Sequence, residues 1–235
     1  MPEVNTEIAD VFILCGGQGT RFRAVREDIP KALAPINGVP FLDLLLNNLI
    51  AQECQRIILG TGYRSEQIEA HIQKRSDVEY LISGEEVPLG TGGAIQNALP
   101  LFKSEQVLVL NGDSYIAFSI QALIDFHKTQ QADATILLSS TIEGEDYGNV
   151  VIEENQRIRS FQEKPRESNG QLINAGVYCL QKDLIQRQQA GSASLETDWF
   201  PRWLANERVF GMVLSESFYD IGTPERYEFA NHIIE

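Results

Sequence analysis

The sequence predicts an α/β fold with a mainly parallel central sheet flanked by helices. Short apolar runs at residues 12–14, 56–59 and 106–110 have the length and composition of buried strands. Segments with helical periodicity separate these runs, and such alternation is typical of a parallel sheet. Two glycine-rich turns, at residues 16–19 and 90–93, follow predicted strands. Because ligands bind at the carboxyl ends of parallel strands, this fold class places both turns at a candidate site.

Length and composition indicate one large domain and exclude several partners. The chain has 235 residues, of which 43% are hydrophobic, enough for a substantial core. Its net charge of −14 argues against nucleic acid and membrane surfaces, since either would need a basic face. Cys15, Cys54 and Cys179 are too widely spaced to indicate disulfides or a zinc site. With a polar N-terminus and no apolar run of membrane-spanning length, we expect a cytoplasmic protein.

The first glycine-rich turn, at residues 16–21, is a candidate phosphate cradle. Glycine backbones let N–H groups approach an anion, and Arg21 adds a permanent positive fork. A P-loop would need Gly-Lys-Ser/Thr, but Thr20 and Arg21 follow Gly19 here. A dinucleotide-binding turn would need an acid after the second strand, where the sequence has glycine and threonine at 60–62. The residues alone leave a phosphate cradle and a purely geometric strand-to-helix turn both open.

A lysine between two prolines follows this turn. Lys31 stands between Pro30 and Pro35. Because proline forbids a continuous helix and disfavours helical backbone in the preceding residue, we expect a stiff, extended loop close to Arg21. A phosphate ligand and a solvated surface lysine are both open interpretations of Lys31.

The next elements complete a β-α-β-α-β opening. Periodicity predicts two helices and a third strand, over 40–53, 65–74 and 78–82. A second glycine-rich turn at residues 85–94 leads into a short helix over 94–99. Two such turns in one half of the chain favour a nucleotide site.

Asp113 comes just after the strand over 106–110, in the sequence Asn111-Gly112-Asp113. Asn-Gly is the strongest hairpin signal. However, the strand is fully apolar rather than alternating, and an amphipathic helix over 119–128 follows, which favours a buried parallel strand ending in a ligand-facing loop. A carboxylate there is a candidate Mg²⁺ ligand, since magnesium takes one or two protein carboxylates and fills its shell with phosphates and water.

The second half has shorter elements. We expect strands over 135–140, 147–152, 158–165, 174–180 and 209–214, turns at 153–156 and 218–223, and helices over 194–206 and from 224 to the C-terminus. Thr223 is the expected N-cap of the last helix, with Pro224 at its first position.

Asp220 and the histidines have alternative roles. Asp220 either favours the dipole of the last helix or supplies a second metal carboxylate opposite Asp113. His71, His127 and His232 fall in or at the ends of predicted helices, which indicates surface or packing roles.

Taken together and in their order along the chain, these motifs resemble those of the sugar-1-phosphate nucleotidyltransferases. The resemblance covers essentially the whole chain. The family's G-G-x-G-T-R and Pro-Lys match residues 16–21 and 30–31. Its nucleotide loop, G-D, E-K-P, N-A-G and D-I-G-T-P match residues 88–93, 112–113, 163–165, 174–176 and 220–224. The L-x-P-L-T that usually follows the arginine is replaced by Phe-Arg-Ala-Val-Arg at 22–26.

The resemblance implies one Rossmann-like, GT-A-like domain over residues 1–235 with a small sugar-binding β subregion. Residues 1–130 would form the nucleotide-binding half and 131–235 the sugar-phosphate-binding half. No hexapeptide repeat follows, so no C-terminal left-handed β-helix is expected.

The resemblance also implies the site residues. Nucleotide binding falls to Leu14, Gly16, Gly17, Gly19, Thr20, Arg21, Lys31, Gly90, Thr91, Gly92 and Gly112. Arg21, Lys31 and Asp113 are the expected catalytic residues. Sugar-phosphate binding falls to Tyr147, Gly148, Glu163, Lys164, Asn174 and Gly176, and Mg²⁺ binding to Asp113 and Asp220.

The implied reaction joins a nucleoside triphosphate and a sugar 1-phosphate, giving an NDP-sugar and pyrophosphate. Cys15, the spacing to Lys31 and the loop at 86–94 look most like the D-glycero-α-D-manno-heptose 1-phosphate guanylyltransferases, which favours GTP and a product for cell-surface polysaccharide. Uridylyl, thymidylyl or guanylyl transfer to another sugar 1-phosphate, such as a hexose or MurNAc type, and a non-catalytic sensing homologue stay as alternatives. The assembly is left open between a monomer and a homodimer.

Overall fold

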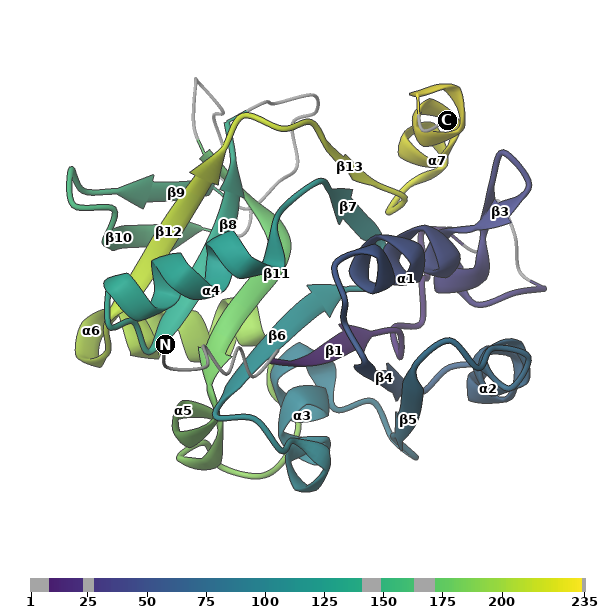
Figure 1. Ribbon diagram of the computed structural model, residues 1–235, viewed down its shortest axis with the longest axis horizontal. Helices are drawn as coiled ribbons and strands as arrows, with labels where there is room; N and C mark the ends of the chain where they lie inside the picture. The colour runs from purple at the N-terminus through teal and green to yellow at the C-terminus, as the bar shows by residue number, and fades with distance from the viewer. Residues whose placement is uncertain (1–8, 23–27, 141–148, 163–171, 234–235) are drawn as a thin grey trace, which may run out of the picture.

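The protein is described here by a computed structural model that covers residues 9–22, 28–140, 149–162 and 172–233. A nine-stranded sheet forms its centre, in the order β10-β9-β11-β6-β1-β4-β5, with β8 paired to β11 and β12 paired to β8 (Figure 1). The strands are β1 (Asp10–Leu14), β4 (Arg56–Thr61), β5 (Glu79–Gly84), β6 (Gln106–Asn111), β8 (Ala134–Ser139), β9 (Asn149–Ile152), β10 (Ile158–Gln162), β11 (Leu172–Gln181) and β12 (Val209–Leu214). The predicted α/β fold class is confirmed.

The first half of the sheet is wholly parallel. β1 pairs in parallel with β4 on one side and with β6 on the other, and β5 extends the sheet beyond β4. The chain runs outward from β1 through β4 to β5 and then returns to β6. The direction of strand addition therefore reverses between β1 and β6, the point at which open α/β sheets bind ligands.

β11 joins this parallel half to the second half. It pairs antiparallel with β6, β8 and β9, while β12 lies parallel to β8 and β10 antiparallel to β9. The pairing of β11 with β8 shifts register between Asn174 and Tyr178, and Gly176 within this shift has a φ of +70°. Bulges of this kind redirect side chains and often lie beside sites.

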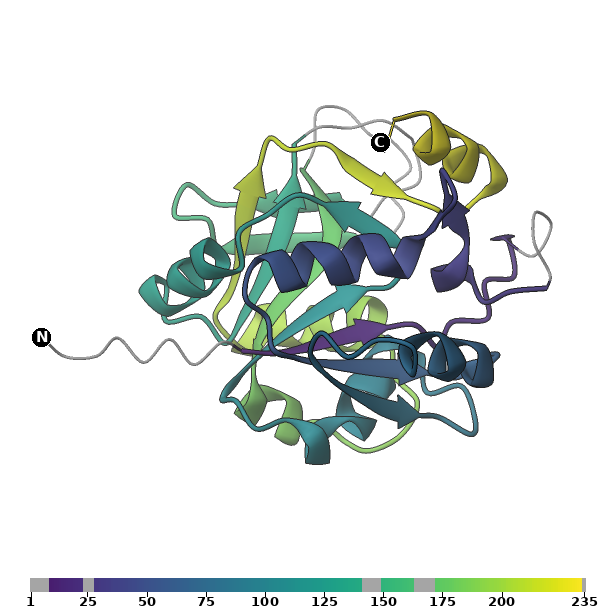
Figure 2. The same ribbon diagram turned by 45° about the vertical axis from the view of Figure 1, so that its right-hand side comes forward.

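Two cores cover the two faces of the sheet, because successive strand residues point to opposite sides. In β1, Val11 and Ile13 belong to one core and Phe12 to the other. The first core receives α1 (Phe41–Ala51), α2 (Ser65–Ile72), α4 (Ile120–Thr129) and α7 (Pro224–Ile233). The second receives α3 (Gly90–Asn97), α5 (Lys182–Gln186) and α6 (Phe200–Asn206). Figure 2 shows α1 and α3 on opposite sides of β1.

Several predicted boundaries were wrong for physical reasons. The helix expected over 94–99 begins at Gly90, so the second glycine turn is itself the first turn of α3. The segment expected to be extended around Lys31 forms the 3₁₀ turn η2 (Lys31–Leu33), because the constraint of Pro35 falls only on the residue before it, Ala34. Pro30 and Ala34, which flank the turn, have ψ values of 145° and 128°. The helix over 194–206 splits into the π-turn η4 (Leu195–Trp199) and α6. The short 3₁₀ turn η3 (Leu99–Leu101) follows α3.

The segment expected as a turn at 218–223 contains the strand β13 (Phe218–Asp220). It pairs antiparallel with β7 (Ser114–Ile116), and this ribbon places Asp220 opposite Ser114. The hairpin alternative for Asn111 is wrong, since β6 pairs with β1 and β11 rather than with β7. A second ribbon joins β2 (Pro35–Ile36) to β3 (Val39–Pro40). The predicted strand residues 147–148 and 163–165 lie outside the described residues.

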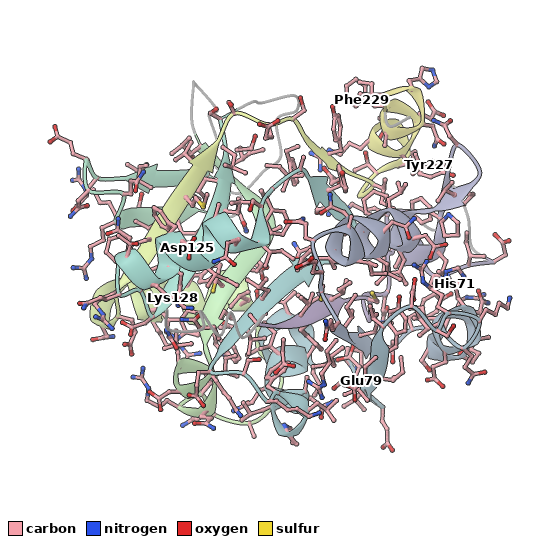
Figure 3. All side chains as sticks on the ribbon, viewed as in Figure 1. His71, Glu79, Asp125, Lys128, Tyr227 and Phe229 are labelled. Atoms are coloured by element: carbon pink, nitrogen blue, oxygen red, sulfur yellow. The ribbon has the colours of Figure 1, made fainter. Side chains whose placement is uncertain are left out.

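The histidines and the outer surface match the predicted packing and surface roles. His71 lies 2.8 Å from the Asp43 carboxylate, His127 is buried on the inner side of α4, and His232 is exposed. Figure 3 shows Asp125 and Lys128 on the outer side of α4 and Phe229 on α7. Among the described helices, none combines the length and apolar character needed to cross a membrane.

Candidate functional site

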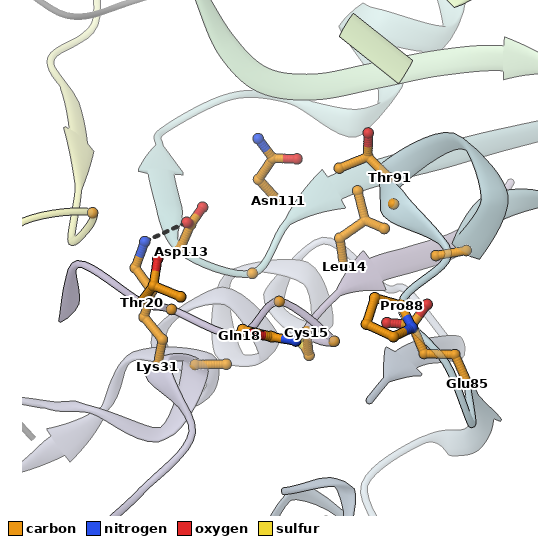
Figure 4. Close-up of a pocket in the computed structure, with 18 of the residues that line it drawn as sticks. Leu14, Cys15, Gln18, Thr20, Lys31, Glu85, Pro88, Thr91, Asn111 and Asp113 are labelled. Carbon is orange, nitrogen blue, oxygen red and sulfur yellow. Dashed lines mark hydrogen bonds and ion pairs between the residues drawn. The ribbon is translucent and has the colours of Figure 1, made fainter. Parts of the chain in front are cut away.

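A pocket of about 400 Å³ opens where β1 and β6 end (Figure 4). It brings together the two glycine turns, η2, and the loops after β5, β6 and β13. Ten of the eleven predicted nucleotide-binding residues line it: Leu14, Gly16, Gly17, Gly19, Thr20, Arg21, Lys31, Gly90, Thr91 and Gly112. Asp113 lines it as well. The sheet's switch point and the predicted motifs therefore coincide.

The first glycine turn is shaped by close packing as well as by exposure. A Cβ at Gly16 would lie 2.7 Å from Glu85 Oε1, and one at Gly112 would lie 2.6 Å from Leu14 O. Glycine at 16 lets the loop after β1 pass close to the ends of β4 and β5, and glycine at 112 lets the loop after β6 pass close to the end of β1. Gly17, Thr20 and Arg21 are exposed. At its base the turn is thus closely packed, whereas at its tip the backbone and the Arg21 side chain are accessible to a ligand.

Lys31 and Asp113 form an ion pair at the pocket wall. Lys31 Nζ lies 2.5 Å from Asp113 Oδ2 (Figure 4). Burial would raise the pKa of the Asp113 carboxyl, but the Lys31 ammonium and hydrogen bonds from Lys31 and Ser114 outweigh it and hold this pKa below its usual value. The carboxylate therefore stays ionised and available as a cation ligand.

Asp220 is brought beside this pair by the β7–β13 ribbon. Ile221 N donates to Asp113 O over 3.0 Å, and the Asp220 side chain is 8% exposed. Its Oδ1 accepts from Gly222 N at 2.7 Å, and Arg226 Nη1 lies 3.3 Å from Oδ2. Oδ2 accepts no geometrically acceptable hydrogen bond from the described residues. A buried carboxylate oxygen that accepts no hydrogen bond suits a hard cation, which Asp220 would share with Asp113.

The donor set matches magnesium more closely than zinc. No group of three or more metal-ligating histidine, cysteine or acidic side chains is found among the described residues. Magnesium needs only one or two protein carboxylates, whereas zinc takes three or four nitrogen or sulfur ligands. Cys15 is not available as a thiolate, because burial, and then the charge of Asp113, raise its pKa to about 12.

Gly92 is the predicted nucleotide-binding residue that does not line the pocket. It is buried, and a Cβ there would lie 2.9 Å from the Trp199 ring. Its N–H and that of Gly93 both donate to Ala193 O, at 2.9 and 3.1 Å. These two N–H groups in the first turn of α3 are therefore already hydrogen-bonded within the protein. The role of Gly92 is to allow close packing against Trp199.

The predicted sugar side is only partly described. Asn174 and Gly176 lie on β11, where Gly176 N donates to Asn174 Oδ1 at 3.0 Å. Gly176 packs against Asn111, since a Cβ there would lie 2.8 Å from Asn111 Nδ2, and Asn111 lines the pocket. The remaining predicted residues, Tyr147, Gly148, Glu163 and Lys164, lie outside the described residues and stay predictions.

Sequence reasoning missed several residues that line the pocket: Cys15, Gln18, Ala32, Glu85, Pro88, Ala94, Asn111 and Gly222. Glu85 is notable among them, since burial raises the pKa of its carboxyl while Leu89 N donates to Oε2 at 3.1 Å. Both Glu85 and Asn111 stand at the carboxyl end of a predicted strand, the same signal that identified Asp113. That signal could have found them.

The chain is similar to several known proteins. Residues 10–235 match the family described as "Nucleotidyl transferase". The chain is 34% identical over 229 residues to a mannose-1-phosphate guanylyltransferase of Mycobacterium tuberculosis. The alignment covers 94% of this chain but only 63% of that protein. The chain is also 34% identical over 223 residues to a D-glycero-α-D-manno-heptose 1-phosphate guanylyltransferase of Aneurinibacillus thermoaerophilus, covering 94% of this chain and 96% of that protein.

Solved structures give the same picture. The crystal structure of HddC from Yersinia pseudotuberculosis superposes with a TM-score of 0.87 at 33% identity, covering 97% of this chain and 100% of that one. The same protein complexed with GMP-PN superposes equally well, with a TM-score of 0.87 at 34% identity.

Proposed function

The chain belongs to the nucleotidyl transferase family, and we propose that it joins GTP to D-glycero-α-D-manno-heptose 1-phosphate, forming GDP-heptose and releasing pyrophosphate. The observation that carries this proposal is one pocket in which both glycine turns meet Lys31 and Asp113. Backbone N–H groups and cations suit a triphosphate, and a carboxylate suits the metal that accompanies it.

The chemistry needs alignment more than acid–base groups. An oxygen of the sugar phosphate would form a bond to the α-phosphorus of GTP, and the bond from that phosphorus to the bridging oxygen would break, leaving its electron pair on pyrophosphate. With a second phosphate pKa of about 6, the nucleophile is largely ionised at neutral pH. The protein's task is then to hold both phosphates in line and to offset their charge.

Individual roles follow from placement. Lys31 and Arg21 would hold the triphosphate and the departing pyrophosphate, and the turn at 16–19 would receive phosphate oxygens. Asp113 and Asp220 would hold Mg²⁺, which when bound would neutralise charge on the phosphates. Glu163, Lys164 and Asn174, with Tyr147 and the backbone at Gly148 and Gly176, would bind the sugar phosphate. Residues 1–130 and 131–235 would thus act as nucleotide and sugar halves of one domain.

Glu85 favours guanine as the base. Its carboxylate borders the pocket beside the first glycine turn (Figure 4). Among the described residues, only Leu89 N donates a hydrogen bond to this carboxylate. The Watson–Crick edge of guanine offers two adjacent N–H donors, which a carboxylate accepts together. Uracil and thymine offer a single N–H between two carbonyl oxygens, and a carboxylate would repel these oxygens. The guanylyltransferase relatives and the GMP-PN complex of the Yersinia protein support the same base.

Replacing Glu85 tests the base. In Glu85→Gln, loss of a bidentate contact worth roughly 1–3 kcal/mol should lower kcat/KM for GTP by about 10- to 100-fold and raise the relative use of UTP and dTTP. Pyrophosphate release with each triphosphate measures both effects. Glu86→Gln removes the neighbouring exposed carboxylate and should leave the preference unchanged. An unaltered GTP preference in Glu85→Gln would show that Glu85 does not read the base.

Mannose 1-phosphate is the second candidate sugar, since the mycobacterial mannose enzyme is as similar in sequence as the heptose enzyme. Pyrophosphate release across GTP, UTP and dTTP with heptose, mannose and glucose 1-phosphates decides between them. Turnover confined to UTP or dTTP would contradict guanylyl transfer. We place the reaction in the cytoplasm, where nucleoside triphosphates are available.

A further inference from the structure

Glu196, the centre of a partly buried hydrogen-bond network, has no place in the roles given above. Glu196 lies in the π-turn η4, half-buried, and accepts hydrogen bonds from three hydroxyls. Thr91 Oγ1 donates to its Oε2 at 2.7 Å, Ser194 Oγ to the same oxygen at 3.0 Å, and Tyr178 Oη to Oε1 at 3.3 Å. Thr91 and Glu196 are 105 residues apart in the chain. Single π-turns of this kind often occur at functional sites.

The segment that carries Glu196 packs against the second glycine turn. Thr91 Oγ1 also accepts from Leu195 N at 2.7 Å, and Ala193 N donates to Leu89 O at 2.8 Å. The approach is too close for a side chain at Gly90, where a Cβ would lie 2.5 Å from Ala193 O. Residues 193–196 therefore set the position of Thr91, which faces the pocket.

The other carboxylate oxygen, Oε1, connects Glu196 to β11 through Tyr178. Tyr178 on β11 is fully buried, and burial and the charge of Glu196 raise the pKa of its hydroxyl well above the usual value, so it remains a donor. This hydroxyl accepts from Asn174 Nδ2 at 2.8 Å. Asn174 Oδ1 in turn accepts from Gly176 N at 3.0 Å, and Gly176 packs against Asn111. Asn111 lines the pocket, and its Oδ1 is buried without a partner among the described residues. Glu196 thus connects Thr91, which lines the pocket, to Tyr178 and Asn174 on β11.

We propose that Glu196 is a positioning residue, which fixes Thr91 on the nucleotide side relative to β11, whose Asn174 and Gly176 would receive the sugar phosphate. This inference rests on the proposed transfer between two substrates. Two phosphates must meet in line, and a displacement of about 1 Å can cost about 100-fold in rate. A single carboxylate that accepts from Thr91 on α3 and from Tyr178 on β11 fixes the separation of these two elements.

A matched pair of variants tests the proposal. Glu196→Gln exchanges one acceptor oxygen for a donor that faces hydroxyl donors, and it keeps the size of the side chain. Asp198→Asn alters an exposed carboxylate of the same π-turn that accepts from Ser194 N at 2.7 Å but contacts neither Thr91 nor Tyr178 in the hydrogen bonds described. Both variants are measured by pyrophosphate release with GTP and the best sugar 1-phosphate, by GTP binding without sugar phosphate, and by thermal unfolding.

The proposal predicts a split between turnover and binding. In Glu196→Gln, kcat should fall by about 10- to 100-fold, while the Kd for GTP alone changes by less than about threefold. Asp198→Asn should keep kcat within about twofold, as surface changes usually do. In a cycle with Thr91→Val, the double variant should lose little more than the worse single variant, because both break one connection.

Other results would overturn it in distinguishable ways. Equal kcat losses in Glu196→Gln and Asp198→Asn would mean that Glu196 only stabilises the π-turn. A loss confined to GTP binding would make it a direct ligand, and full additivity with Thr91→Val would exclude action through Thr91. If the wild-type chain transfers no nucleotide to any sugar 1-phosphate, the proposed function fails, and the inference fails with it.

Discussion

At the scale of single residues, the pocket concentrates scarce positive charge beside carboxylates. In a chain of net charge −14, Lys31 is placed 2.5 Å from Asp113 and is thereby held in one orientation before any substrate arrives. A preorganised cation costs no reorganisation during the reaction, which is what electrostatic catalysis requires. In the proposed function, the same carboxylate, kept ionised by Lys31, would hold a metal together with Asp220. Lys31 and Asp113 are therefore interdependent.

Asp113→Asn tests this interdependence. The amide keeps the size of the side chain but lacks the charge for a metal, so kcat should fall by about 100- to 1000-fold, on the scale seen when a key electrostatic group is removed. Pyrophosphate release measures turnover, and thermal unfolding shows that the fold persists. Asp133→Asn, which breaks an ion pair with Arg208 far from the pocket, is the control and should keep its turnover. Near-normal turnover in Asp113→Asn would remove this residue from the metal site.

At the scale of elements, the second glycine turn works as part of a helix rather than as a free loop. It begins α3, and residues 191–199 pack directly beneath it. Because the Trp199 ring, which is 1% exposed, packs directly against Gly92, any side chain at Gly92 would meet it. The glycines here let two segments distant in sequence come together, and the ligand-facing residue Thr91 gains its position from that contact.

Gly92→Ala tests this packing role. Overpacking a buried site costs roughly 1–3 kcal/mol, which outweighs the gain of at most about 1 kcal/mol that alanine brings to a helix. We expect a lower free energy of unfolding, measured by urea titration. Combination with Trp199→Phe, which shortens the opposing ring, should cost less than the sum of the single changes. Gly84→Ala is the control, since its Cβ would meet only Thr61 Oγ1 at 3.9 Å. A Gly92→Ala variant of unchanged stability would contradict the packing role.

At the scale of the whole molecule, one buried histidine links global stability to pH. His127 is fully buried, with Nδ1 2.8 Å from Thr135 Oγ1 and Nε2 3.1 Å from Gln181 Nε2. Burial lowers its pKa from 6.5 to about 4, against the opposing charge of Asp133 and with smaller contributions from Arg208 and Lys128. The ring is therefore neutral in the folded protein at neutral pH.

The direction of the pH effect follows from this shift. The unfolded chain binds the proton more tightly, so the contribution of His127 to stability is complete above pH 6.5 and is lost as the pH falls toward 4. Between pH 7.5 and 5 the wild type should lose about 2 kcal/mol more than His127→Gln, which cannot titrate. Urea unfolding at both pH values measures the difference. His232→Gln, at an exposed site, should behave like the wild type, and parallel pH profiles for wild type and His127→Gln would refute the assignment.

Much of the fold and part of the site could be predicted because their signals are local. The apolar runs at 106–110 and 209–214 became strands with nearly the predicted bounds, and Thr223 caps α7 through a hydrogen bond from Arg226 N at 3.4 Å. Periodicity and caps depend only on neighbouring residues. The bounds of α3 and the split at Leu195 could not be predicted, because both depend on the contact between residues 90–93 and 191–199.

The sequence by itself determined the alternation of strands and helices, the glycine turns, and the charged residues Arg21, Lys31, Asp113 and Asp220 that a two-phosphate reaction would need. Only the tertiary structure decided which of these meet. The order of strands puts β1 beside β6, the β7–β13 ribbon puts Asp220 beside Asp113, and the π-turn puts Glu196 beneath Thr91. Local pattern specifies what each segment becomes, whereas contacts across about a hundred residues depend on how the two buried faces pack, and no short stretch of sequence contains that information.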